Sequence, residues 1–211
     1  MQDLRATLED GIQRLGLTLP EGAVDALLAY LAMLVKWNRA YNLTAVRDPG
    51  EMVARHLLDS LAVVPYLHGE HIIDVGTGAG LPGIPLAIAY PERSFVLLDS
   101  NSKKTRFLVQ AKAELGLGNI EVVHCRVEEY CPAQHPDCVI SRAYASIADI
   151  LSSCGHLLHA NGEFLAMKGV VPEQELAALP PPWQLREVIV LQVPGLEREQ
   201  RHLLRIGAQL R

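Results

Sequence analysis

The stretch IIDVGTGAGLPGIPLA, residues 72–87, decides the fold of this chain. It begins with four residues typical of a short buried strand and continues with glycines at Gly76, Gly78 and Gly80. Glycine lets the backbone turn tightly against a ligand. Two glycine patterns fit at once, because Gly83 adds a G-x-G-x-x-G frame to the G-x-G-x-G frame. The glycines therefore predict a ligand-binding turn after a strand and leave the ligand open.

From this stretch onward, short β-rich runs alternate with helical runs, which predicts a parallel sheet with right-handed helical crossovers. The last two apolar runs, at 184–193 and 201–207, are joined by a link too short for a crossover, so we expect an antiparallel hairpin. The expected fold is a Rossmann-like α/β fold with a seven-stranded, mostly parallel sheet and one antiparallel strand. The other five strands are expected at IIDV (72–75), SFVLLD (94–99), IEVVHC (120–125), DCVISRA (137–143) and GEFLAMKG (162–169).

Residues 1–67 follow a different pattern, with apolar residues at helical spacing. Amphipathic helices are expected at 3–17, 21–40 and 52–67. We therefore divide the chain into an N-terminal helical extension, 1–67, and a sheet-containing domain, 68–211. A length of 211 residues suits one large domain with such an extension better than two independent domains.

Composition restricts the classes of protein. The chain is 49% apolar and 20% charged, and no apolar run approaches the roughly 18 to 20 residues that span a membrane. The N-terminus lacks the apolar run of a signal peptide, so a cytoplasmic location is expected. The four cysteines have no C-x-x-C spacing, and we expect reduced thiols and no metal site. A net charge of −5 disfavours broad nonspecific binding to nucleic acid and still permits a local basic patch.

Two carboxylates narrow the choice of ligand. Asp99 follows the second predicted strand, at the place where a carboxylate accepts hydrogen bonds from ribose hydroxyls in both NAD and S-adenosylmethionine sites. Asp74, two residues before the glycine turn, would repel a pyrophosphate and attract the sulfonium and ammonium groups of S-adenosylmethionine. The residues therefore favour S-adenosylmethionine, with a nicotinamide-dependent oxidoreductase as the less favoured alternative.

The later strand ends carry two cationic side chains. Arg142 lies at the end of the fourth predicted strand, where enzymes that methylate exocyclic amines have an NPPY-like loop and enzymes that methylate cytosine C5 have a Pro-Cys turn. Its planar guanidinium is a donor for a base edge, a phosphate or a carboxylate, and a structural salt bridge is the alternative interpretation. Lys168 follows the fifth strand and is a weaker candidate, because a lysine at a strand end is often solvated.

Several motifs together resemble the RsmG (GidB) family of bacterial methyltransferases, which modify N7 of a guanine in 16S ribosomal RNA. The motifs are KWNRAYNLT (36–44), RHLLDS (55–60), DVGTGAGLPGIP (74–85), LLDS (97–100), RVEE (126–129) and SRA (141–143). The resemblance covers essentially the whole chain. It implies a class I S-adenosylmethionine-dependent methyltransferase fold, position 527 of that RNA as the acceptor, and S-adenosylhomocysteine as the product. The family often has proline where this chain has Ala79, a change that leaves the turn intact.

The resemblance also implies a set of site residues. Cofactor contacts carried over from the family are Gly76, Leu81, Val127, Glu128 and Arg142, and the residues themselves add Asp74, Gly78, Gly80 and Asp99. On chemistry alone, Glu129 is as good a candidate as its neighbour Glu128. Arg142 and Lys168 are the candidate catalytic residues. The helical extension is expected on the RNA side of the cleft, with RNA contacts at Asn38, Arg39, Asn42, Arg47, Arg55 and His56.

Two aromatic residues of the extension have two interpretations. Trp37 and Tyr41, four residues apart on one helix, could stack on bases, and such pairs are more often core or cap residues. The expected partner is 16S ribosomal RNA within the small subunit or an assembly particle, without a membrane and with the enzyme as a monomer. A second hypothesis is a non-catalytic assembly factor that binds ribosomal RNA on a methyltransferase scaffold.

Overall fold

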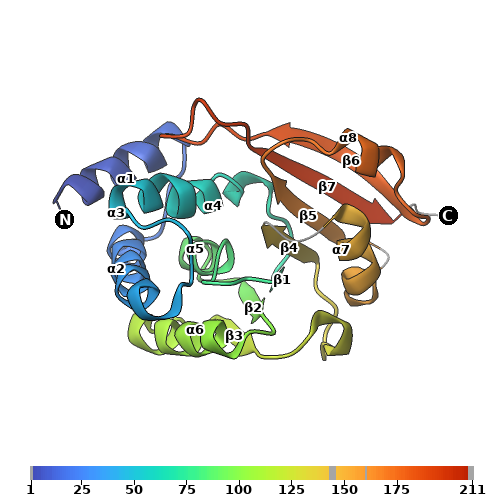
Figure 1. The fold of residues 1–211 in the computed structure, drawn as a ribbon, viewed down its shortest axis with the longest axis horizontal. Helices are drawn as coiled ribbons and strands as arrows, with labels where there is room; N and C mark the ends of the chain where they lie inside the picture. Colours follow the sequence, from blue (N-terminus) through green and yellow to red (C-terminus); the bar gives the residue numbers. More distant parts are fainter. Residues whose placement is uncertain (1, 143–145, 160, 209–211) are drawn as a thin grey trace.

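The computed structural model describes residues 2–142, 146–159 and 161–208. Its strands are β1 (His71–Val75), β2 (Ser94–Leu98), β3 (Ile120–Val123), β4 (Cys138–Arg142), β5 (Glu163–Lys168), β6 (Trp183–Val190) and β7 (His202–Ala208). They form one sheet in the order β3-β2-β1-β4-β5-β7-β6 (Figure 1). β7 runs antiparallel to β5 and β6, and the other neighbouring strands are parallel. The predicted sheet is confirmed, and Ala143, which ends the fourth predicted strand, lies outside the described residues.

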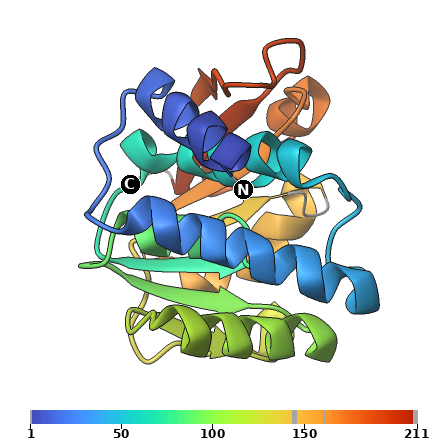
Figure 2. The same ribbon diagram turned by 90° about the vertical axis from the view of Figure 1, so that its left-hand side faces the viewer.

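Helices cover both faces of the sheet. They are α1 (Gln2–Arg14), α2 (Ala23–Tyr41), α3 (Pro49–Met52), α4 (Asp59–Leu61), α5 (Gly83–Ala89), α6 (Ser102–Leu115), α7 (Ile147–Cys154) and α8 (Glu173–Ala177). On one face α2, α5 and α6 pack in a single hydrophobic cluster that includes Phe107 of α6 and Phe95 of β2 (Figure 2). On the other face Ile150 of α7 packs with Phe164 of β5. The result is the three-layer arrangement expected from alternating strands and helices.

The N-terminal helices share a core with the sheet. Leu8 of α1 and Leu27 of α2 are fully buried in the same cluster as Leu97 of β2. The buried hydroxyl of Tyr30 donates a hydrogen bond to the carbonyl of Ala79, at 2.7 Å, and so ties α2 to the glycine turn. Both parts of the chain thus contribute to one core. The division into an extension, 1–67, and a domain, 68–211, remains a prediction from the sequence.

The third predicted helix, 52–67, is broken into pieces. It begins earlier, at Pro49, where the side chain of Asp48 accepts a hydrogen bond from the backbone N–H of Glu51 at 2.9 Å and caps the helix. A π-helical turn, η1 (Val53–Leu58), then separates α3 from α4, and a short 3₁₀ turn, η2 (Val64–Tyr66), follows. Such turns often occur at functional sites in helices, because they shift side chains out of the regular helical positions.

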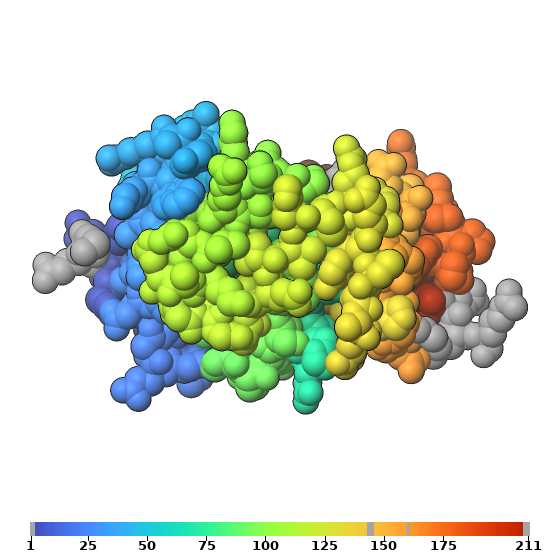
Figure 3. All heavy atoms as spheres, turned by 90° about the horizontal axis from the view of Figure 1, so that it is seen from below, coloured from blue at the N-terminus to red at the C-terminus, as the bar shows by residue number. Residues whose placement is uncertain are grey.

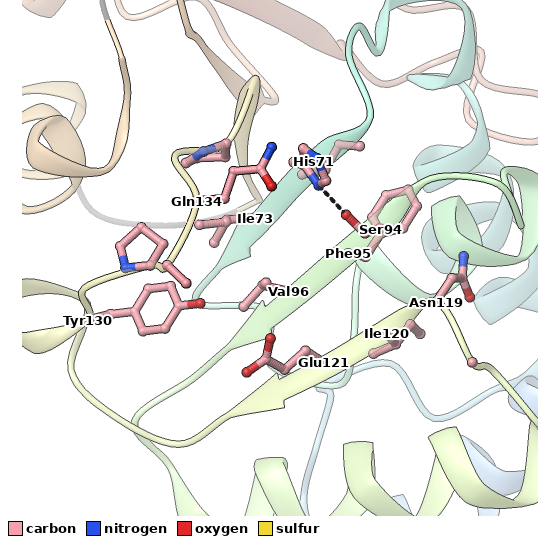
Figure 4. Close-up of a pocket in the computed structure, with 15 residues that line it drawn as sticks. His71, Ile73, Ser94, Phe95, Val96, Asn119, Ile120, Glu121, Tyr130 and Gln134 are labelled. Atoms are coloured by element: carbon pink, nitrogen blue, oxygen red, sulfur yellow. Dashed lines mark hydrogen bonds between the residues drawn. The ribbon is translucent and has the colours of Figure 1, made fainter.

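The connection from β3 to β4 differs from the other parallel connections, because the described part contains only a 3₁₀ turn, η3 (Val127–Glu129), in place of a helix. A cavity lies beside this connection at the amino ends of β1 to β3, where Nδ1 of His71 lies 2.6 Å from Oγ of Ser94 and the ring of Tyr130 forms one wall (Figure 4). None of the predicted site residues lines this cavity. None of the described helices is long and apolar enough to cross a membrane.

Candidate functional site

The glycine turn connects β1 to α5 at the carboxyl edge of the sheet. Gly76, Gly78 and Gly80 all have positive φ, between 63° and 89°, which side chains other than glycine adopt rarely. At Gly80 a Cβ atom would lie 2.5 Å from the side chain of Ile84, so glycine is also required for packing. At Gly78 the space is open, and Nζ of Lys104 is the nearest atom, at 3.8 Å from a Cβ position. Gly78 therefore leaves room for a ligand to approach the backbone.

Asp74 holds this turn from inside the protein. Its carboxylate is fully buried, and Oδ2 accepts hydrogen bonds from Oγ1 of Thr77 at 2.6 Å and from the backbone N–H of Gly83 at 2.8 Å. Oδ1 has no partner among the described residues. Burial raises the pKa of Asp74 to about 7, against the effect of the two hydrogen bonds. At neutral pH the carboxyl carries only part of a negative charge, so the electrostatic argument against a pyrophosphate is weaker than the sequence implied.

Asp99 lies at the end of β2 with its carboxylate against the same turn. Its Oδ2 accepts a hydrogen bond from the backbone N–H of Gly78 at 2.9 Å, and Oδ1 accepts one from Asn101 at 2.8 Å. Nζ of Lys104 lies 3.6 Å from Oδ2. The turn and the end of β2 are therefore joined by one carboxylate.

A polar cavity of about 290 Å³ opens beside Asp99. It brings together Gly76, Asp99, Val127 and Glu128, which the sequence assigned to the cofactor. Glu129, the alternative to Glu128, does not line it. The other lining residues are Val75, Leu98, Ser100, Lys104, Cys125 and Arg126.

The remaining predicted cofactor residues lie outside this cavity. Leu81 is buried in the hydrophobic core, at 4% exposure, and Gly80 is buried in the turn. Arg142 lines a neighbouring cavity. The tertiary structure thus separates residues that shape the turn from residues that can touch a ligand directly.

This second cavity, of about 330 Å³, lies where β4 and β5 end. Nη1 of Arg142 donates to Oδ2 of the buried Asp59 at 3.2 Å and to the carbonyl of Arg55 at 2.9 Å. Arg201 donates from Nε to Oδ1 of Asp59 at 3.1 Å. Asp59 therefore holds two guanidinium groups at one cavity. The cavity is lined by Val46, Arg55, His56, Asp59, Arg142, Met167, Lys168, Gly169, Leu191, Arg201 and His202.

His56 is part of the wall of this cavity and is only 4% exposed. Its Nε2 lies 2.9 Å from Oγ1 of Thr44, and Nδ1 has no partner among the described residues. Burial and the positive charge of Arg142 lower the pKa of His56 to about 4. The imidazole is therefore neutral at physiological pH and does not pair with phosphate as a cation.

The predicted RNA contacts in the last turn of α2 and in the loop after it have distinct surroundings. Asn38 is buried and holds the loop, because its side chain accepts from the N–H of Thr44 at 2.9 Å and donates to the carbonyl of Val46 at 3.2 Å. Arg47 donates to Oδ1 of Asn42 at 2.6 Å and to the carbonyl of Asn38. Asn38 therefore shapes the loop, whereas Asn42 and Arg47 remain exposed on its surface.

The other basic and aromatic candidates also include both side chains with partners inside the protein and side chains that are exposed. Arg55 pairs with Glu199, and Arg39 is exposed on α2. Trp37 packs edge-on against Phe107 of α6, with ring centroids 5.6 Å apart, as the core interpretation predicted. Tyr41 stacks on Trp37, with ring centroids 5.2 Å apart, and its side chain remains 42% exposed.

Arg201 is a site residue that the sequence analysis missed. It lies at the end of the loop between β6 and β7, and its guanidinium contacts both Asp59 and Glu199. No spacing or motif links Arg201 to the glycine turn, which precedes it by more than a hundred residues. Only the reversed direction of β7 brings the start of this strand to the carboxyl ends of β4 and β5.

Comparisons with known proteins identify the family. A model of the GidB family, rRNA small subunit methyltransferase G, matches residues 23–204. The chain belongs to the rRNA small subunit methyltransferase G family. The methyltransferase G of Ectopseudomonas mendocina (strain ymp) is 57% identical over 199 residues, which cover 93% of this chain and 92% of the relative. That of Serratia proteamaculans (strain 568) is 54% identical over 207 residues, 97% of this chain and 100% of the relative.

Solved structures agree with the fold of this family. The N-methyltransferase NodS of Bradyrhizobium japonicum WM9, in complex with S-adenosylhomocysteine, has a TM-score of 0.58 at 13% identity, over 84% of this chain and 99% of NodS. An S-adenosylmethionine-dependent methyltransferase of Aquifex aeolicus has a TM-score of 0.59 at 16% identity, over 82% of this chain and 97% of its own. These similarities confirm the Rossmann-like methyltransferase fold. Family membership sets aside the nicotinamide oxidoreductase alternative.

As a member of the methyltransferase G family, the chain is an enzyme that uses S-adenosylmethionine as its methyl donor. The cavity beside Asp99 fits this cofactor. Asp99 and Glu128 line it with carboxylates, and Gly76 lines it with the backbone of the glycine turn. We expect Asp99 to bind ribose hydroxyls and the residues around Val127 to contact the adenine.

Proposed function

We propose that this enzyme transfers the methyl group of S-adenosylmethionine to N7 of a guanine in 16S ribosomal RNA. The family match over residues 23–204 supports a ribosomal RNA substrate. The cavity at the ends of β4 and β5 supports guanine, because the Arg142 guanidinium is a planar donor of the kind that addresses O6 beside N7. The position of Arg142 in this cavity is the main support for guanine as the acceptor.

The geometry suits a reaction that depends on orientation. S-adenosylmethionine supplies a methyl group bonded to a cationic sulfur, and guanine N7 has a free in-plane lone pair, so no proton has to be removed first. The task of the enzyme is to hold the acceptor about 3 to 3.5 Å from the methyl group and in line with it. Asp59 and the carbonyl of Arg55 fix the Arg142 guanidinium before the substrate binds. Lys168, in the same cavity, adds positive charge near the RNA.

The RNA approaches from the helical side of the molecule in this proposal, so residues 1–67 form the RNA side of the cleft. Arg39, Asn42, Arg47 and Arg55 contact the RNA from exposed or half-buried positions. Asn38 and His56 act from buried positions by shaping the loop and the cavity wall. The enzyme acts as a cytoplasmic monomer on the small ribosomal subunit or an assembly particle.

Labelled S-adenosylmethionine tests the proposal directly. The enzyme is incubated with small ribosomal subunits from cells that lack it, and the modified base is mapped by cleavage specific for N7-methylguanine. We expect one labelled guanine. Absence of label while S-adenosylhomocysteine still binds would overturn the proposed reaction and favour the non-catalytic RNA-binding factor. Label on another atom would retain the enzyme class and change the acceptor.

A further inference from the structure

Several basic side chains, Arg39, Arg47, Lys112, Arg126 and Arg198 among them, have no carboxylate partner among the described residues, and three others of this kind lie on two packed helices. Many basic side chains lie within 4.0 Å of a carboxylate, namely Arg5, Arg14, Arg55, Arg93, Lys104, Arg142, Arg186, Arg201 and Arg205. Lys36 of α2 and Lys103 and Arg106 of α6 have no such carboxylate among the described residues, and all three are exposed. Their charge is therefore available to an external anion.

These three cations lie on two helices that pack against each other. α2 and α6 pack side by side, as Figures 2 and 3 show, and Phe107 of α6 contacts Tyr30 and Trp37 of α2 at ring-centroid distances of 6.2 and 5.6 Å. At about 100° per residue, Lys103 lies about 40° around α6 from Phe107 and Arg106 about 100° from it, so Lys103 is the nearer of the two to the contact with α2.

Lys36 is the third cation and lies on α2. It precedes Trp37 on α2 and lies on the exposed side of that helix. We call Lys36, Lys103 and Arg106 the basic seam. α6 as a whole carries Lys103, Lys104, Arg106 and Lys112 against a single acidic residue, Glu114, in a protein with a net charge of −5.

The basic seam leads to the functional site. Lys104, next to Lys103, lines the cofactor cavity. At the end of α2, the exposed ring of Tyr41 stacks on Trp37, and the following loop reaches the second cavity through Val46. A nucleic acid strand that presents a base to the second cavity would pass the exposed side chain of Tyr41 and continue along α2 and α6.

Arg55 and Arg201, which line the second cavity, are already paired with carboxylates. Glu199 and Asp59 pair with Arg55 and Arg201, so much of their charge is already compensated within the protein. Phosphate binding there would require these ion pairs to open, whereas the basic seam has none to open.

We propose that the basic seam binds the phosphate backbone of the RNA strand that carries the acceptor base. This inference rests on the proposed function and assigns α6, which the sequence analysis left out of the RNA surface, a direct role in substrate binding. Each lysine or arginine that contacts a phosphate releases a counterion, so its contribution appears in the salt dependence of binding.

Charge removal on α6 tests the inference with a control on the same helix. We measure binding of small ribosomal subunits that lack the modification over a series of salt concentrations, for the wild type, K103Q/R106Q and K112Q. Lys112, nine residues after Lys103, lies on the opposite side of α6 at about 100° per residue. We expect K103Q/R106Q to bind about tenfold more weakly and to reduce the slope of log Kd against log salt by about 2, while K112Q leaves both nearly unchanged.

Two further readouts separate the inference from the proposed reaction. S-adenosylhomocysteine affinity and urea unfolding confirm that each variant is folded and binds cofactor. Wild-type affinity and slope in K103Q/R106Q would overturn the basic seam even if the enzyme methylates RNA, and equal losses in K112Q would do the same. Loss of binding only in K103Q/R106Q, with no methyl transfer by the wild type, would overturn the proposed reaction and support the basic seam.

Discussion

Oδ2 of Asp59 accepts a hydrogen bond from Nη1 of Arg142 at 3.2 Å, although 83 positions separate the two residues in the sequence. Asp59 is nearly fully buried and also binds Arg201 through its other oxygen. A buried carboxylate shared by two guanidinium groups fixes both of them in one orientation, because moving either would leave a charge without a partner. The acceptor cavity is therefore organised before any substrate binds.

Asp59→Asn removes the charge at the centre of this network and keeps the shape of the side chain. We expect the free energy of unfolding to fall by about 2 to 3 kcal/mol, because two partly buried guanidinium groups lose their buried anion. We expect kcat/KM to fall at least about tenfold. Glu51→Gln is the control, since Glu51 makes only an exposed 3.8 Å contact with Arg55 and should change unfolding by less than about 0.5 kcal/mol. Equal effects of the two substitutions would contradict the role of Asp59.

Arg142→Lys keeps a positive charge and loses the planar donor. If Arg142 orients guanine, kcat should fall about a hundredfold or more while S-adenosylhomocysteine affinity changes less than about threefold. Arg205→Lys is the matched control, because Arg205 of β7 pairs with Glu163 of β5 and Glu187 of β6, outside both cavities, and should leave kcat intact. Wild-type kcat per folded molecule in Arg142→Lys would remove this residue from the mechanism.

Tyr30→Phe tests the link between α2 and the glycine turn. The substitution deletes a buried hydroxyl that donates to Ala79, so we expect a loss of about 1 kcal/mol in unfolding free energy and weaker S-adenosylhomocysteine binding. Tyr90→Phe also deletes a donor, to the carbonyl of Val64 at 2.8 Å, at a site away from the turn. It should cost similar stability and leave cofactor affinity unchanged. Isothermal titration of both variants makes the comparison, and equal cofactor affinities would show that the turn does not depend on Tyr30.

Asp74 predicts a pH dependence of stability. Burial raises its pKa to about 7 in the folded protein, whereas an unfolded aspartate titrates near about 3.9. Between these values the folded state binds the proton more strongly, so the free energy of unfolding falls as pH rises from about 4 to about 7. The decrease is at most about 4 kcal/mol, at about 1.4 kcal/mol per pKa unit.

Urea unfolding of the wild type and Asp74→Asn across this pH range measures the effect. The asparagine variant should lose less stability than the wild type as pH rises, because it has no proton to release. Parallel pH profiles would show that Asp74 titrates normally in the folded protein.

The glycine turn and Asn38 show which features the sequence predicts and which it does not. The spacing of Gly76, Gly78 and Gly80 after a strand predicted the turn, and each has the positive φ that the prediction requires. The motif around Asn38 predicts an RNA contact, and the structure shows that its side chain is buried and holds the loop. A motif shows which residue type occupies a position, but it does not show whether the side chain is exposed or buried.

The sequence by itself determined the order of strands and helices, the glycine turn and the carboxylate after β2, because these depend on neighbours in the chain and on local periodicity. The tertiary structure alone decided the partners of Asp59, the place of Arg201 in the site and the neutral state of His56. Those features arise where segments distant in sequence meet at one edge of the sheet. These features depend on burial and on charges that are close in space, and the spacing of residues along the chain shows neither.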